Sequence, residues 1–346
     1  MQMSVKIGFR VDANEHIATG HLMRCIAIAK ACENLGLKCK FYLAENKMTS
    51  KLDDNNLPYD ILHTEWDRLH KEIPVMTELI KREQLQWLIV DSYQADAYYL
   101  TSLNKACKVM YIDDFTEKPY DIAAVLHYNY IKNDTEFEKL YKNTGTMVLA
   151  GSDYVPLRRE FQKKIPVQRE QAILITTGGT DPYMITQRIL EHKNEYIKLR
   201  QYTFHVILGS MNQSVKKLEL LAKGDSKIIL HQNVNNMSDY MRKCECAVSA
   251  GGTTLYELCA CETPTVCFSF ADNQKQFVKS MGRDGIMISA GDVRENNQIE
   301  KNILSAITEL TEREELRNRF VEKMRNLIDG LGTVRIAKAL SEADIR

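Results

Sequence analysis

Near the start of the sequence stand Phe9-Arg-Val-Asp-Ala-Asn14 and, four residues later, Ala18-Thr-Gly-His-Leu-Met-Arg-Cys25. This pattern predicts a short apolar strand, a polar loop and a long amphipathic helix that begins near Gly20. The first N–H groups of such a helix are unpaired and its dipole is positive there, so the loop is a candidate anion site. The same dipole disfavours an imidazolium. We therefore expect His21 to be neutral and able to act as a general base.

Short apolar segments alternate with longer helical patterns along the rest of the chain. In the first half, strands are expected at 5–11, 38–43, 87–91, 109–113, 123–127 and 147–150. In the second half, they are expected at 172–176, 204–208, 227–230, 247–250 and 265–268. Helical patterns stand between them, for example at 20–35, 73–83, 182–199 and 254–261. The alternation predicts an α/β protein with doubly wound, Rossmann-like parallel sheets.

The second half repeats the plan of the first. Ala172-Ile-Leu-Ile-Thr-Thr177 predicts a strand, Gly178-Gly-Thr-Asp181 a tight loop, and Pro182 the first helical residue after an aspartate cap. We therefore expect two domains that face each other across a cleft. They are residues 1–162 and 170–346, and the polar stretch 161–170 is the linker. Residues after about 296 form a helical tail that we assign to the second domain, with packing back on the first domain as the alternative.

Composition excludes several classes of function. The 346 residues hold 46 Lys and Arg against 46 Asp and Glu, so nucleic-acid binding has no electrostatic basis. The first residues do not predict a signal peptide, and no apolar run approaches the roughly 20 residues of a membrane span. Among the nine cysteines, Cys259 and Cys261 point apart on one helix, so they cannot share a metal ion. A soluble, cytoplasmic protein with reduced thiols and no metal is expected.

A third glycine loop follows the strand at 247–250. In it, Gly251, Gly252, Thr253 and Thr254 offer backbone N–H groups and hydroxyls, which suit a pyrophosphate. Glu257, one helical turn later, is placed to accept hydrogen bonds from a ribose diol. The alternative is a plain tight turn followed by a solvated glutamate. The combination of hydroxyls and carboxylate favours the binding site.

Further polar residues follow other strands, where doubly wound sheets place functional groups. Asp12 and the pair Asp113-Asp114 end two strands of the first half, and Ala271-Asp-Asn-Gln274 follows a strand of the second. Each set has the alternative of ordinary loop or helix caps, and His21 has that of a packed core histidine. The sequence has no Gly-x-Gly-x-x-Gly fingerprint with its acidic partner, no P-loop and no Gly-x-Ser-x-Gly elbow. These absences disfavour a redox dinucleotide, a P-loop kinase and a serine hydrolase.

Taken together, the motifs resemble a known family. They are Arg10-Val-Asp12 with Thr19-Gly-His-Leu-Met-Arg-Cys25, then Leu149-Ala-Gly-Ser-Asp-Tyr-Val-Pro-Leu-Arg-Arg-Glu-Phe161, Gly178-Gly-Thr-Asp-Pro182, and Ala250-Gly-Gly-Thr-Thr with Glu257 and Asn273-Gln274. In this order they are similar to the UDP-2,4-diacetamido-2,4,6-trideoxy-β-L-altropyranose hydrolases of pseudaminic acid biosynthesis and to related spore-coat polysaccharide proteins. The resemblance covers roughly residues 5 to 285, and its last two motifs are shared with wider GT-B glycosyltransferases.

The resemblance implies a GT-B, MurG-like fold and a UDP-sugar hydrolase without metal or cofactor. It implies that His21 activates water for inverting attack at the anomeric carbon, with Asp12 orienting the histidine or the water. Predicted substrate contacts come from all three loops and are Gly20, Arg24, Gly178, Gly179, Thr180, Gly251, Gly252, Thr253, Thr254, Glu257, Asn273 and Gln274. Thr177 replaces a frequent Met, and Leu255-Tyr256 stand where a Trp is frequent, which leaves the exact sugar open.

Two other functions share these features. A MurG-like glycosyltransferase would use the same nucleotide site with a sugar or lipid acceptor, although no convincing acceptor patch is evident in the first domain. A non-catalytic nucleotide-sugar binding protein would need the glycine loops but not His21. The sequence leaves the oligomeric state undetermined.

Overall fold

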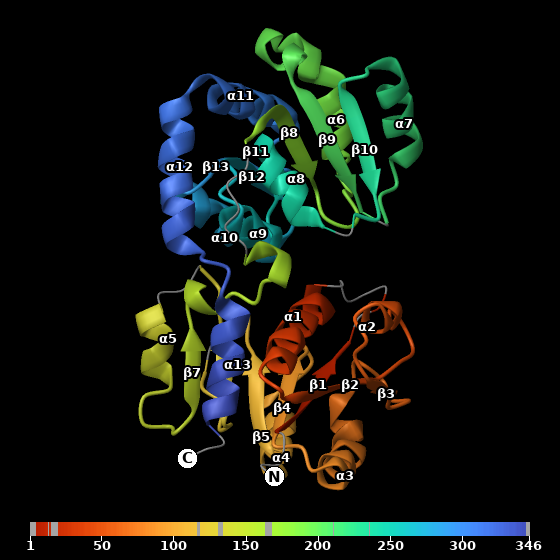
Figure 1. Ribbon diagram of the computed structural model, residues 1–346, viewed down its shortest axis with the longest axis vertical. Helices are drawn as coiled ribbons and strands as arrows, with labels where there is room; N and C mark the ends of the chain where they lie inside the picture. Colours follow the sequence, from red (N-terminus) through yellow and green to blue (C-terminus); the bar gives the residue numbers. More distant parts are fainter. Residues whose placement is uncertain are drawn as a thin grey trace. The chain divides into compact units, whose positions relative to one another are not determined.

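The protein divides into two compact units, each with one parallel sheet (Figure 1). The computed structural model describes residues 5–12, 14, 20–115, 118–130, 134–162, 168–209, 211–234 and 236–343. Unit 1 consists of Met1–Arg158 and Gly330–Arg346, and unit 2 of Arg159–Asp329. The two predicted α/β sheets are thereby confirmed. Thr19 and residues 163–167 of the expected linker, Pro166 included, lie outside the described residues.

The sheet of unit 1 has seven strands in the order β3-β2-β1-β4-β5-β6-β7. β1 lies between β2 and β4, and Ile7 pairs with Cys39 on one side and Trp87 on the other. Because helices cover both faces of such a sheet, its central strands are apolar at consecutive positions rather than at every second one. The strands are β1 (Lys6–Val11), β2 (Lys38–Leu43), β3 (Tyr59–Ile61), β4 (Trp87–Asp91), β5 (Lys108–Ile112), β6 (Ala124–His127) and β7 (Met147–Ala150).

Helices of unit 1 connect these strands and cover the sheet. The first of them, which carries His21, buries an apolar stripe that includes Leu22, Ile26 and Ala29. The α-helices are α1 (Gly20–Asn34), α2 (Ser50–Asp53), α3 (Ile73–Glu83), α4 (Ala97–Asn104), α5 (Asp134–Leu140) and α13 (Gly332–Glu342). Short 3₁₀ turns lie at Leu69–Glu72 and Ser152–Tyr154.

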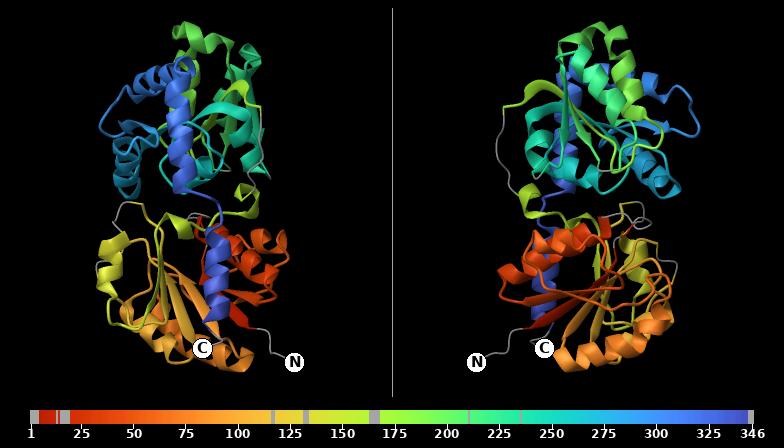
Figure 2. Two further views of the ribbon diagram at one scale, coloured as in Figure 1. Left: turned by 60° about the vertical axis from the view of Figure 1, so that its left-hand side comes forward. Right: turned by 90° about the vertical axis from the view of Figure 1, so that its right-hand side faces the viewer.

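The last helix of unit 1, α13, corrects the expected domain boundary. It packs against α1, and Figure 2 shows the two helices side by side from two directions. A Cβ atom on Gly332 would lie 2.2 Å from the Val155 carbonyl oxygen, so only glycine allows this close approach. Thr333 and Arg335 donate hydrogen bonds to the carbonyls of Leu157 and Asp153. Residues from Gly330 onward therefore complete unit 1 rather than the second domain.

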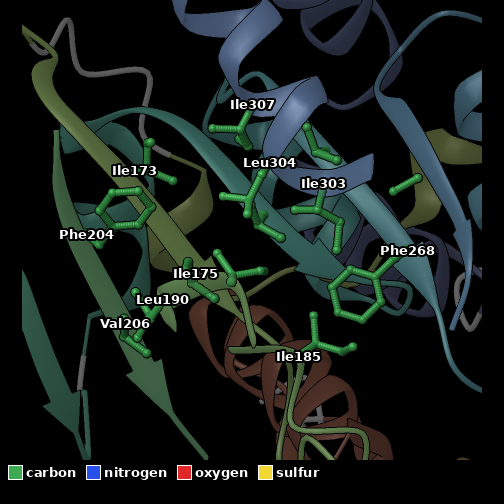
Figure 3. Packing of buried hydrophobic residues seen from close by; sticks show 14 of the residues in the cluster. Ile173, Ile175, Ile185, Leu190, Phe204, Val206, Phe268, Ile303, Leu304 and Ile307 are labelled. Atoms are coloured by element: carbon green, nitrogen blue, oxygen red, sulfur yellow. The ribbon is translucent and has the colours of Figure 1, made fainter. Parts of the chain in front are cut away.

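The sheet of unit 2 has six strands in the order β10-β9-β8-β11-β12-β13. Its core contains Ile173, Ile175, Phe204, Val206 and Phe268 from the strands, packed against helices on one face (Figure 3). The strands are β8 (Glu170–Thr176), β9 (Thr203–Leu208), β10 (Ile228–Gln232), β11 (Cys244–Ala250), β12 (Thr265–Ser269) and β13 (Ile288–Asp292). The α-helices are α6 (Ile185–His192), α7 (Val215–Gly224), α8 (Met237–Lys243), α9 (Thr254–Ala260), α10 (Asp272–Arg283), α11 (Ile299–Glu312) and α12 (Glu314–Leu327).

The helix α6 begins three residues later than its sequence pattern suggests. Asp181 does cap it, but by accepting hydrogen bonds from the N–H groups of Ile185 and Thr186 at 2.9 and 3.0 Å. Met184 adopts a left-handed conformation immediately before the first helical residue. Pro182 therefore lies in the loop, and the loop after β8 is longer than predicted.

Each sheet has one point at which the strand order reverses. In unit 1 the chain proceeds outward from β1 to β2 and β3, and then from β4 to β5, β6 and β7 on the other side. In unit 2 the corresponding strands are β8 and β11. Ligands of doubly wound proteins bind at such switch points, beyond the carboxyl ends of the strands. The two switch points are therefore where a site is expected.

Candidate active site

Polar side chains converge beyond the carboxyl ends of β1 and β4 in unit 1. Asp12 directly follows β1, and Asp91 is the last residue of β4. His21 lies in the first turn of α1, which starts from the loop after β1. Because β1 and β4 are neighbours in the sheet, these residues share the edge at which its topology switches.

His21 forms a hydrogen-bonded pair with Asp91. The His21 Nδ1 atom lies 2.6 Å from the Asp91 Oδ1 atom, and the imidazole is 12% exposed while the carboxylate is fully buried. An ionised carboxylate can only accept, so Nδ1 carries the proton and donates it. In the neutral ring this leaves the lone pair on Nε2. The Arg24 Nη2 atom is also 3.1 Å from Nδ1. Because guanidinium nitrogens only donate, Arg24 cannot accept the Nδ1 proton, and Asp91 is its acceptor.

Asp91 is kept ionised by residues from the same turn of α1. Arg24 donates from Nε and Nη2 to the two Asp91 oxygens at 2.6 Å, and Cys25 Sγ lies 3.5 Å from Oδ2. Burial alone would raise the pKa of Asp91, but Arg24 and His21 outweigh burial and hold this pKa well below its ordinary value. His21, Arg24 and Cys25 of α1 thus all contact the Asp91 carboxylate.

Arg24, a predicted substrate contact, lies among several polar side chains of unit 1. Its guanidinium is buried, and its Nη1 atom lies 3.0 Å from both carboxylate oxygens of Asp114 and donates to the Tyr128 hydroxyl. Burial would lower the pKa of Arg24, but Asp114 and Asp91 raise it well above its usual value. All three guanidinium nitrogens are engaged by protein groups. Arg24 therefore holds Asp91 in place, and its contact with a substrate stays a prediction.

Asp12 belongs to a neighbouring buried ionic network. Its Oδ2 accepts from Arg10 Nη1 at 2.6 Å and its Oδ1 from the Ala44 N–H at 2.9 Å. Arg10, which is fully buried, also pairs with Glu72 at 2.6 and 2.9 Å. The carboxylate that orients His21 is thus that of Asp91, which corrects this part of the expected role of Asp12. A contact of Asp12 with water or substrate stays a prediction.

In unit 2, two glycine loops start from adjacent strand ends. Thr176 of β8 pairs with Ser249 of β11, and the loops that begin with Gly178 and Gly251 follow immediately. Gly178, Gly179 and Thr180 are exposed. The first loop is therefore exposed, whereas Gly251 is buried and its N–H donates to the Phe268 carbonyl at 2.7 Å. A nucleotide contact at this edge stays a prediction.

The loop after β9 packs directly on the first glycine loop. A Cβ atom on Gly209 would lie 2.4 Å from the carbonyl oxygens of both Gly178 and Gly179, so residue 209 must be glycine. Gly178 itself has φ +81°, a conformation that favours glycine. The Met211 N–H donates to the Gly179 carbonyl at 3.1 Å. Gly209 thus supports the loop, and its only signal in the sequence is a glycine after a strand.

The second glycine loop is packed against α10. A Cβ atom on Gly251 would lie 2.7 Å from Val278 Cγ2 and 3.0 Å from Gln274 Cβ. The Gln274 Oε1 atom accepts from the Phe270 N–H at 3.1 Å and so closes the turn before α10. The structure therefore brings two of the predicted contact residues, Gly251 and Gln274, into one packed unit.

The remaining predicted contact residues lie around these two loops. Thr253 and Asn273 are exposed, while Gly252, Thr254 and Glu257 are partly buried at the start of α9. Gly20, the first residue of α1, is also exposed. Their substrate contacts remain predictions.

Sequence reasoning missed Asp91, Tyr93 and Tyr128. Asp91 is the last residue of β4, and Tyr93 and Tyr128 lie just beyond the ends of β4 and β6. Tyr93 contacts the His21–Asp91–Arg24 cluster through a ring edge, and Tyr128 does so through its hydroxyl. The available signal for Asp91 was an aspartate at the end of a wholly apolar strand, Trp87–Asp91. Its partner could not be recognised without the strand order.

Two features of the described part of the chain bear on other classes of site. Among the helices that the structure describes, none combines the length and apolar character that a membrane crossing requires. Within the same residues, no group of three or more His, Cys, Asp or Glu side chains is arranged to hold a metal ion.

The fold is the two-domain α/β fold of the GT-B glycosyltransferases. Residues 158–327, a range that nearly coincides with unit 2, match the family model of Glycosyl transferases group 1. Among solved structures, Acinetobacter baumannii MurG aligns with a TM-score of 0.66 over 97% of this chain and 99% of its own, at 13% identity. Medicago truncatula UGT71G1, complexed with UDP-glucose, aligns with a TM-score of 0.67 over 98% of both chains, at 10% identity.

Sequence relatives confirm the more specific resemblance. The UDP-2,4-diacetamido-2,4,6-trideoxy-beta-L-altropyranose hydrolase of Campylobacter jejuni is 24% identical over 285 residues, which cover 81% of this chain and 97% of the relative. A Helicobacter pylori protein that joins this hydrolase to a pseudaminic acid cytidylyltransferase is 27% identical over 82% of this chain and 49% of its own. The Bacillus subtilis spore coat polysaccharide biosynthesis protein SpsG is 22% identical over 97% of this chain and 98% of its own.

Proposed function

We propose that this protein is a sugar-nucleotide-processing enzyme that hydrolyses a UDP-linked 2,4-diacetamido-2,4,6-trideoxyhexose to UDP and the free sugar. The observation that carries the proposal is the His21–Asp91 pair, in which an ionised carboxylate fixes the imidazole tautomer with Nε2 able to accept a proton. The sugar and its place in pseudaminic acid biosynthesis rest on the names of the relatives.

In the proposed reaction, His21 Nε2 accepts a proton from a water molecule as its oxygen attacks the anomeric carbon. The bond between that carbon and the UDP oxygen breaks, and the bonding electrons leave with UDP. A single displacement of this kind inverts the anomeric configuration. The imidazolium forms beside the Asp91 carboxylate, which stabilises its charge, and then releases the proton to solvent.

Unit 2 supplies the nucleotide-binding groups in this proposal. The backbone N–H groups and hydroxyls of the loops at 178–180 and 252–254 meet the pyrophosphate, and Glu257 meets the ribose. The Gly251 N–H donates to the Phe268 carbonyl, so Gly251 contributes through its close packing on α10. Stabilisation of the leaving diphosphate by N–H donors makes a metal ion or cofactor unnecessary in the proposal. Turnover that persists in excess EDTA supports this point, and turnover restored only by a divalent cation contradicts it. The free cysteines, eight of them buried, favour the cytoplasm as the compartment.

The test is hydrolysis in ¹⁸O-labelled water without acceptor or metal. UDP and free sugar are followed over time, and the position of the label is determined by mass spectrometry. Label in the sugar supports water attack at carbon. Label in the phosphate of UDP contradicts the mechanism, because it requires attack at phosphorus.

A glycosyltransferase is the second candidate. The match of residues 158–327 to Glycosyl transferases group 1 and the likeness to MurG favour it. In that case His21 would deprotonate an acceptor hydroxyl instead of water. Release of UDP that depends on an added sugar or lipid acceptor, with no release in its absence, distinguishes the transferase from the hydrolase. Binding of UDP-sugars without turnover under either condition identifies a binding protein.

A further inference from the structure

A closed ring of contacts in unit 1 runs from His21 through four other side chains and back to His21. Asp91 holds the imidazole, Arg24 holds Asp91, and Arg24 in turn holds Asp114 at 3.0 Å. The Tyr93 hydroxyl donates to Asp114 Oδ2 at 2.8 Å. The Tyr93 ring then lies edge-on against the His21 ring, with centroids 4.5 Å apart and planes at 82°.

Asp114 is the one member of the ring that joins the two sides of His21. Its carboxylate bonds Arg24, whose other nitrogens hold the Asp91 carboxylate on the Nδ1 side of the imidazole. The same carboxylate bonds the Tyr93 hydroxyl, and the Tyr93 ring contacts the imidazole directly. Without the hydroxyl contact, rotation of Tyr93 would be limited only by packing, and this side chain is about half exposed.

We propose that Asp114 is a positioning residue, which fixes the His21 ring by holding Arg24 and Tyr93 at the same time. The inference rests on the proposed role of His21 as the base. This positioning role differs from a role of Asp114 as a simple counter-ion of Arg24, because a counter-ion would not need to bond the Tyr93 hydroxyl.

Two further properties of the ring agree with this role. Partial burial and the neighbouring Asp114 raise the pKa of Tyr93, so the phenol remains protonated and its O–H can donate. Arg24 is the single cation beside two carboxylates, so the ring is negatively charged while His21 is neutral. A positive charge on His21 would balance this charge within the ring.

The test uses Asp114→Asn and Tyr93→Phe in the full chain. Asn keeps the size of the side chain but removes its charge, and Phe keeps the ring but removes the hydroxyl. Asp121→Asn is the matched control, because Asp121 is an exposed carboxylate before the amino end of β6, at the opposite edge of the same sheet. The tautomer of His21 is read from ¹⁵N spectra of histidine-labelled protein, in which its signals are identified by their loss in His21→Ala.

We expect wild type and Asp121→Asn to show one His21 tautomer with the proton on Nδ1. Both Asp114→Asn and Tyr93→Phe should shift the two nitrogen signals toward a tautomer average. With a UDP-sugar that is turned over, kcat should fall roughly tenfold and KM should change less than about twofold, because the base is misplaced and the ligand is not. Both variants remove the charge-assisted hydrogen bond between Tyr93 and Asp114. The double variant should therefore have a kcat no lower than that of Asp114→Asn.

Several outcomes overturn the proposal. They are a wild-type His21 spectrum in Asp114→Asn, an equal shift in Asp121→Asn, and additive losses of kcat in the double variant. The spectra need no substrate. An unchanged spectrum together with measurable hydrolysis therefore refutes the role of Asp114 alone, and a shifted spectrum without any hydrolysis refutes only the proposed function.

Discussion

At the switch point of unit 1, Asp12 follows β1 and Asp91 ends β4, whereas at that of unit 2 the strands β8 and β11 lead into Gly178 and Gly251. The topology is the same, but the first edge carries charged side chains and the second carries glycine loops, of which the one at 178–180 is exposed. A buried carboxylate can orient a base, and exposed N–H groups can neutralise a diphosphate. In the proposed function, this difference divides one fold, used twice, between proton transfer in unit 1 and nucleotide binding in unit 2.

The largest effect should come from removing the base of unit 1. We expect His21→Ala to lower turnover of a UDP-sugar by roughly 100-fold or more, because general-base catalysis contributes at least that much. Binding of UDP, measured by calorimetry, should be unchanged because the binding loops belong to unit 2. His70→Ala is the matched control, since His70 also pairs with an aspartate, Asp96, at 2.9 Å but is exposed. Loss of UDP binding in His21→Ala would break the division between the units.

The second effect concerns the orientation of the base. Asp91→Asn leaves His21 in place but replaces an acceptor-only carboxylate by an amide, so the tautomer is no longer fixed. We expect kcat to fall roughly 30-fold, less than when the base is removed, with little change in KM. Asp96→Asn serves as the control because Asp96 pairs with the exposed His70 and its cap to the Tyr99 N–H can be kept by Asn. Equal losses in both variants would argue against orientation by Asp91.

The third effect tests the backbone site of unit 2. In Gly209→Ala the new methyl group meets two carbonyl oxygens of the first glycine loop and must displace it. We expect UDP to bind roughly tenfold more weakly, which corresponds to about 1.4 kcal/mol. A Cβ atom on Gly224, in the same unit, has nothing within 4 Å, so Gly224→Ala should bind UDP like the wild type. Full affinity in Gly209→Ala would show that the loop after β8 does not hold the nucleotide.

The smallest effect is on stability and follows from the lowered pKa of Asp91. A group whose pKa is lower in the folded than in the unfolded protein stabilises the fold above its ordinary pKa of about 3.9 and loses this effect as the pH falls. Asp91→Asn should therefore be less stable than the wild type at neutral pH. The difference between the two proteins in free energy of unfolding should decrease by about 1 kcal/mol on acidification to about pH 3. Urea titrations at several pH values measure it, and a gap independent of pH would show that the Asp91 charge does not stabilise unit 1.

The architecture of both units was predictable from sequence because buried parallel strands leave continuous apolar runs between helical patterns. Two short or irregular strands escaped this reasoning. They are β3, with only three residues, and β13, whose Ile288–Asp292 sequence contains Gly291 at φ +104°. The destination of α13 was also hidden, since an amphipathic helix indicates that one face is buried but not against which unit.

The candidate site was predictable only as far as local sequence determines it. His21 was recognisable because the strand, loop and helix that position it are consecutive in the chain. Asp91 lies 70 residues further on, and it contacts His21 only because β4 lies beside β1. In the same strand order, β5 is separated from β1 by β4, and Asp114 follows β5. In the proposal, Asp114 therefore reaches His21 only through Arg24 and Tyr93.

The two-segment composition of unit 1 has a consequence for protein synthesis. During synthesis, residues 1–158 emerge from the ribosome before any of unit 2. The helix α13 packs on α1, which carries His21, but it emerges only after the whole of unit 2. Unit 2 is one continuous segment and can fold while the chain is still growing. We therefore expect the surface of α1 that α13 covers to stay exposed until the residues from Gly330 onward have been synthesised. A nascent chain that stalls within unit 2 would expose this surface to chaperones and proteases.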